Sequence, residues 1–192
     1  MWFGRIGGLL VLGGGVLFMI AGAIYVGGGG IDNLFVDASL ALFGCGAGVL
    51  SVGGPRPLHG RLVRLGLGTL AVGQLSYLAF SIIATASTFD QLGSLLQILR
   101  VGLGAAFLGS LITGLSLVRT RGTSRLVGSL FLAGMLLLAL MAILGDMRIA
   151  LPPHAVLWAL ALAVLGNTGV GLLAINGSRP ATIAAAMTGS HP

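Results

Sequence analysis

The stretch from Gly93 to Leu117, GSLLQILRVGLGAAFLGSLITGLSL, decides the fold, because Arg100 is its only charged residue. A transmembrane helix needs about 20 consecutive, mostly apolar residues, so this run is long enough to cross a bilayer. Five further runs of similar character surround it. The six runs lie at about 5–27, 34–54, 63–86, 93–117, 125–145 and 154–175. The sequence therefore predicts an all-α, polytopic integral membrane bundle of six transmembrane helices.

The composition agrees with this class of protein. Of the 192 residues, 56% are hydrophobic and 7% are charged, whereas a soluble domain has about 25% charged residues. The connections between the runs are short, roughly a dozen residues at most, and no hydrophilic block could fold separately. We therefore expect one six-helix transmembrane domain over residues 1–177 and a short tail over 178–192. The lipid bilayer is the first partner that this composition implies.

The charges divide between the two ends of the predicted bundle. Eight arginines fall on one side, at the two termini and in the second and fourth connections: Arg5, Arg56, Arg61, Arg64, Arg119, Arg121, Arg125 and Arg179. The other side receives Asp32, Asp90 and Asp146, with the single Arg148. The positive-inside rule then places both termini and the tail in the cytoplasm of a multi-pass cell-membrane protein. The net charge of +6 is thus a topological signal, and we expect no nucleic-acid partner, because the basic loops lack interleaved aromatic and amide side chains.

The first run also resembles a cleavable signal peptide. Trp2 to Arg5 resembles the charged n-region of a signal peptide, and Ala21-Gly22-Ala23 resembles a cleavage site of small residues. Removal would leave five helices with the new N-terminus outside. We expect the first run to be retained as a helix.

A repeated spacing suggests that the helices form three related two-helix hairpins. An arginine and a glycine stand nine residues apart at the start of each odd-numbered run, as Arg5 and Gly14, Arg64 and Gly73, and Arg125 and Gly134. The segments GAGVL at 46–50 and GVGLL at 169–173 are also alike. Chance matching is the alternative, because the chain has 34 glycines and topology alone demands arginine at these ends.

Small residues recur at steps of three and four along several runs, so each set lies on one helix face. Transmembrane helices associate through close backbone packing at such small residues. We expect Gly44, Gly48, Gly109 and Gly171 to lie at helix–helix contacts.

Arg100 and Asp37 are charged residues a short way inside the outer end of their runs. An unpaired arginine deep in hydrocarbon costs at least about 2.5 kcal/mol, so an Arg100 that faced the bundle would need a carboxylate, and Asp37 is the candidate. The alternative is that the long side chain of Arg100 reaches the outer interface. The sequence leaves the choice between ion pair and interface open.

Further polar residues could line a cavity that opens to the outside. Gln74, Tyr77 and Ser81 follow helical steps along the third run, and Gln97 and Asn167 add amides from the fourth and sixth runs. The alternative is that these groups hydrogen-bond between helices, where each contributes about 0.6 kcal/mol.

The sequence lacks the patterns that identify an enzyme. There is no H-E-x-x-H, no C-x-x-C and no glutamate, and His59, His154 and His191 lie in connections or the tail. These residues give no catalytic site, no metal site and no cofactor site.

Two classes of function fit this pattern. We expect a non-enzymatic accessory or interaction subunit, with other membrane protein chains or further copies of itself as partners. The alternative is a small-solute permease or channel whose outward-facing polar mouth contains Asp37 and Arg100.

Overall fold

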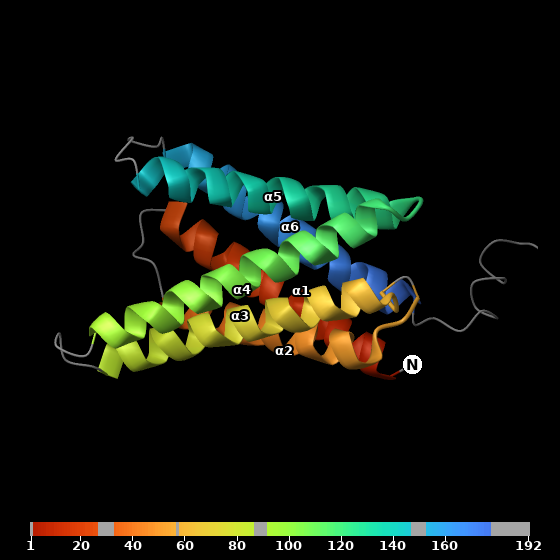
Figure 1. Ribbon diagram of the computed structural model, residues 1–192, viewed down its shortest axis with the longest axis horizontal. Coiled ribbons are helices and arrows are strands. Elements are labelled where there is room, and N and C mark those ends of the chain that lie inside the picture. The colour runs from red at the N-terminus through yellow and green to blue at the C-terminus, as the bar shows by residue number, and fades with distance from the viewer. Residues whose placement is uncertain (1, 27–32, 57, 87–91, 147–152, 178–192) are drawn as a thin grey trace, which may run out of the picture.

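The computed structural model describes residues 2–26, 33–56, 58–86, 92–146 and 153–177 (Figure 1). Within these ranges the chain forms six helices and no strand. The helices are α1 (Trp2–Val26), α2 (Asn33–Gly53), α3 (Arg61–Ala86), α4 (Leu92–Val118), α5 (Thr123–Asp146) and α6 (Pro153–Gly177). The all-helical prediction is thus confirmed, and every predicted helix end lies within three residues of the observed one.

Four of the helices are long and apolar enough to cross a membrane. Their apolar spans are Trp2–Ile24, Leu34–Gly53, Arg61–Ala84 and Leu96–Val118. Helices α5 and α6 contribute shorter apolar stretches in the part of the chain that is described, Thr123–Leu137 and Ala161–Gly177. The membrane class follows from the four spans, and the count of six remains a prediction.

Glycine and proline determine where several helices begin and end. Helix α2 stops at Gly53, directly before Gly54 and Pro55, and proline cannot continue a helix because it lacks the backbone N–H. Helix α6 begins at Pro153, in the first helical turn, where proline is favoured. Gly122, in the turn between α4 and α5, has a φ of 72°. Only glycine adopts this left-handed conformation without steric cost.

The helices are arranged in a ring that follows the chain order. Each helix packs mainly on its neighbours in the sequence, and α6 packs back on α1 to close the ring. Extensive contacts across the ring are absent among the described helices. Consecutive helices are antiparallel (Figure 1). The first residues of α1, α3 and α5 therefore lie at the same end of the bundle as the last residues of α2, α4 and α6.

One glycine marks a tight helix crossing inside each of the three hairpins of the ring. The hairpins are α1–α2, α3–α4 and α5–α6. A Cβ atom on the glycine would collide with the backbone of the partner helix in every case: Gly14 at Ser39, Gly73 at Ala106 and Gly134 at Ala163. These are the three glycines of the repeated arginine–glycine spacing.

The buried apolar core fills one half of the ring, next to the α2–α3 and α4–α5 connections. Its members come from all six helices and include Val11, Leu50, Leu67, Leu117, Phe131 and Ala174. Leu58 of the α2–α3 connection is also fully buried and belongs to this core. This half of the ring is therefore closed by side chains.

Candidate functional site

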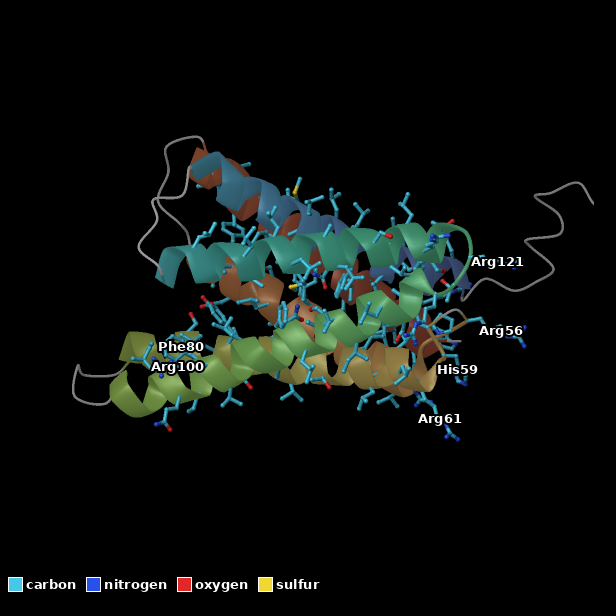
Figure 2. All side chains as sticks on the ribbon, turned by 45° about the horizontal axis from the view of Figure 1, so that its top comes forward. Arg56, His59, Arg61, Phe80, Arg100 and Arg121 are labelled. Carbon is cyan, nitrogen blue, oxygen red and sulfur yellow. The ribbon has the colours of Figure 1, made fainter. Side chains whose placement is uncertain are left out.

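The end of the bundle next to the core carries a cluster of cationic residues. Figure 2 shows Arg56, Arg61 and Arg121 at this end, with His59, while Arg100 and Phe80 lie at the opposite end. We call the first the arginine-rich end and the second the opposite end.

One arginine at the arginine-rich end also holds two helices together. The Arg64 guanidinium on α3 donates hydrogen bonds to the backbone carbonyls of Ser51 and Val52, both at 2.6 Å. These carbonyls lie in the last turn of α2, where they lack helical partners, so Arg64 caps α2. The sequence indicated only its topological role.

Helices α4 and α5 meet at the arginine-rich end and separate toward the opposite end (Figure 1). Gly114 of α4 lies against Leu132 and Gly128 of α5, and it is buried. Phe107 and Arg100 lie seven and fourteen residues before Gly114 and so on the same face of α4. Phe107 is half-buried and Arg100 is exposed. The face of α4 that packs on α5 is therefore uncovered in the half of the helix around Arg100.

We name this uncovered part of α4 the outer α4 surface and define it by Gln97, Arg100, Leu103 and Gly104. All four residues are exposed. A Cβ atom added at Gly104 would have no heavy atom within 4 Å apart from its own residue, its two chain neighbours and the nearby backbone of α4. The outer α4 surface thus combines an amide, a guanidinium and an open glycine on a helix that is long enough to span a membrane.

The position of Arg100 along α4 fits the far boundary of a bilayer. Arg100 and Arg119 are separated by 19 residues, which is about 28 Å at 1.5 Å per residue. The hydrocarbon core of a bilayer is about 30 Å thick. When Arg119 lies at one boundary, Arg100 lies near the other.

Asp37 and Arg100 are not brought together. Asp37 is half-buried and lies seven residues before Gly44, whose face of α2 packs against α3 at Leu75. Arg100 lies nine residues before Gly109, which packs on α3. Nine residues are about two and a half turns, so Arg100 points away from α3. The backbones of α3 and α4 therefore separate the two charged residues.

We therefore expect the changes Arg100→Gln and Asp37→Asn to act independently on stability. Their coupling energy in a double-mutant cycle should stay below about 0.5 kcal/mol. The measurement is the free energy of reversible unfolding in a mild detergent for the wild type, both single variants and the double variant. A coupling well above that value would mean that the two charges pair, as the sequence allowed.

The four glycines predicted to pack lie at helix contacts of very different closeness. Gly44, Gly109 and Gly171 are buried, and a Cβ atom on each would lie less than 3 Å from an atom of a neighbouring helix. At Gly48 the nearest atom would be the Ala71 Cβ, at 3.7 Å. Gly109 and Gly171 require glycine because the close atoms belong to backbone, whereas at Gly44 they belong to the Leu75 side chain, which can shift, and Gly48 has room for a methyl group.

Two amide side chains, Gln74 and Asn167, lie between the core and the opposite end. They share helix faces with the core residues Leu67 and Ala174, seven residues away in each case. Asn167 donates a hydrogen bond from Nδ2 to the Ala163 carbonyl at 2.9 Å. The Oε1 atom of Gln74 is buried and has no hydrogen-bond partner.

The remaining residues of the predicted cavity are more exposed than Gln74. Tyr77 and Ser81 are half-buried on α3, and the Tyr77 ring lies 6.5 Å from that of Phe80. Gln97 lies on the outer α4 surface and is exposed. Across the described ranges, no group of His, Cys, Asp and Glu residues could hold a metal ion.

Comparisons with known proteins return no match for this chain among protein-family models, curated proteins or solved structures.

Proposed function

We propose that this protein is a non-enzymatic interaction subunit of a membrane assembly and that the outer α4 surface contacts its partner. One observation carries the proposal. Gln97, Arg100 and Gly104 are exposed together on a helix long enough to span a membrane, in the half of α4 that lies apart from α5. Nothing in the described chain covers this surface.

The chemistry of the outer α4 surface fits a contact with protein better than a contact with acyl chains. Glycine on an exposed transmembrane face lets a second helix approach closely, and such small-residue contacts supply the dispersion energy of helix association in lipid. A guanidinium and an amide offer several hydrogen-bond donors. Acyl chains cannot accept these hydrogen bonds, whereas another polypeptide can.

The proposal includes a membrane topology. All six helices cross the cell membrane, and the arginine-rich end and both termini lie in the cytoplasm. The pattern of arginines supports this orientation. The tight glycine crossings inside the three hairpins support their origin as related units.

A small-solute permease is the second candidate, and the unpartnered oxygen of Gln74 favours it. Leaving a buried acceptor without a partner costs about 1–3 kcal/mol, and a hydrogen bond from a solute would relieve this cost. However, the core that closes the arginine-rich half of the ring would have to move before a solute could cross. We therefore rank the permease second.

The interaction role predicts site-selective cross-linking in native membranes. A photoreactive amino acid at position 104 should give an adduct with another polypeptide, because Gly104 has open space around it. The matched control is Val72 on α3, which is 61% exposed and lies away from the outer α4 surface. Mass spectrometry of the adducts identifies the captured chain.

The expected result is a strong adduct from position 104 that contains one reproducible polypeptide, and little or none from position 72. A second copy of this chain in the adduct would identify a homo-oligomer and would still support the proposal. Equal capture at both positions, or none at position 104, would contradict it.

A further inference from the structure

The chemistry of the outer α4 surface also indicates what kind of partner it fits, so this inference rests on the proposed function. The partner must supply hydrogen-bond acceptors to the Arg100 guanidinium at the outer boundary of the membrane. It must also lie between α4 and α5 on the side where the two helices separate (Figure 1), and we call this side the opening.

The α5 side of this opening is apolar. Gly128 and Leu132 are the α5 residues that contact α4 at the closed end. Met135 and Ala139 continue the same face seven residues further on, and both are half-buried. Leu136, beside them, is 56% exposed. An occupant therefore meets an apolar wall on the α5 side.

The α4 side of the opening has a charged residue near the membrane boundary and an uncovered glycine one helical turn further in. Arg100 provides a positive charge near the membrane boundary, and Gly104 lies one turn closer to the bilayer centre with open space at its Cβ position. Arg100 is turned away from Asp37 by the arrangement of α2, α3 and α4. Asp37 therefore supplies no carboxylate to this side of α4, and Asp146, the last residue of α5, has a side chain that lies outside the described part of the structure.

We propose that the occupant is a transmembrane helix that packs against Gly104 and α5 and presents a carboxylate to Arg100. A guanidinium binds a carboxylate through two parallel hydrogen bonds, which are among the strongest in proteins. At the membrane boundary both groups keep part of their hydration, so the cost of desolvation is small compared with that of a buried pair. Gly104 then allows the backbone of the partner helix to approach α4 closely.

A model peptide tests this partner chemistry without knowledge of the natural partner. The probe is a synthetic alanine–leucine transmembrane peptide with one aspartate at the depth of Arg100, and the matched probe has asparagine in its place. Both carry an acceptor fluorophore, and the full-length protein carries the donor in vesicles of neutral phosphatidylcholine. Energy transfer as a function of peptide density gives the two dissociation constants at mildly alkaline pH.

The aspartate peptide should bind the wild-type protein about tenfold more tightly than the asparagine peptide, as expected for a charge-assisted bidentate pair. Arg100→Gln should remove this preference, whereas Arg100→Lys should keep part of it. The control is Arg121→Gln, because Arg121 is an exposed arginine at the other end of the bundle, and it should keep the full preference.

Equal binding of the two peptides to the wild-type protein would overturn the inference. Loss of the preference after addition of anionic phosphatidylglycerol would also overturn it, because Arg100 would then bind a lipid phosphate in place of a carboxylate. These outcomes are separable from the proposed function. Cross-linking at position 104 without a charge preference would leave the interaction role intact and reject only the acidic helix.

Discussion

Gly109→Ala is expected to destabilise the protein severely, whereas Gly48→Ala is expected to be neutral or stabilising. A Cβ atom on Gly109 would collide with the backbone nitrogen of Leu70 and lie 2.6 Å from the carbonyl oxygen of Gly66. Both atoms belong to the backbone of α3, which is itself packed against α2. Helices α3 and α4 would have to separate, and overpacking of this kind costs about 1–3 kcal/mol or more.

At Gly48 the same methyl group would make an ordinary contact, 3.7 Å from the Ala71 Cβ. Alanine also has the higher helix propensity, so this change should add up to about 1 kcal/mol. The two variants are compared by their free energies of reversible unfolding in a mild detergent. Equal losses at the two positions would mean that the contact between α3 and α4 is looser than the structure has it.

This contrast marks one limit of prediction from sequence. Steps of three and four placed Gly48 and Gly109 in the same class, because a periodic pattern shows only that residues share a face. How closely a neighbouring helix approaches that face depends on residues distant in the sequence. For Gly109 these are Gly66 and Leu70 of α3. Their backbone atoms lie directly against Gly109, so the two helices cross closely.

The helix ends, in contrast, could be predicted within a few residues. Long apolar runs end where charged residues, glycine or proline begin, and in a membrane these local signals largely determine the helix. The breaks at Gly53-Gly54-Pro55 and at Pro153 are of this local kind.

The roles of Leu58 and Arg64 could not be predicted in the same way. Leu58 lies in a connection, yet it is fully buried in the core. Arg64 donates hydrogen bonds to the last turn of α2, more than ten residues earlier in the chain. Both roles arise from contacts between separate segments, and a single sequence carries no direct signal for them.

The candidate site was predicted in part. The sequence identified Arg100 as a charge near the outer end of a span, and its distance from Arg119 agrees with a boundary position. The pairing with Asp37 rested on similar depth alone and stays a prediction, which the arrangement of α2, α3 and α4 disfavours. Depth along a helix follows from residue number, but the direction of a side chain around the bundle depends on which helices are neighbours, and this information required the structure.

The orientation of the bundle is central to the proposed function, because the outer α4 surface must lie on the side away from the cytoplasm. Cys45 is the only cysteine in the chain, so Cys45→Ala gives a background without thiols. A single cysteine is then introduced as Arg121→Cys, in the exposed turn at the arginine-rich end, or as Thr88→Cys, in the connection between α3 and α4. Intact cells are treated with a thiol reagent that does not cross the membrane.

The effect is expected to be nearly all-or-none, since a bilayer shields one end of the bundle completely. Position 88 should be labelled on intact cells, and position 121 should be labelled only after the membrane is permeabilised. Labelling of position 121 on intact cells, with position 88 protected, would contradict this orientation: the arginine-rich end would then lie outside and the outer α4 surface would face the cytoplasmic leaflet.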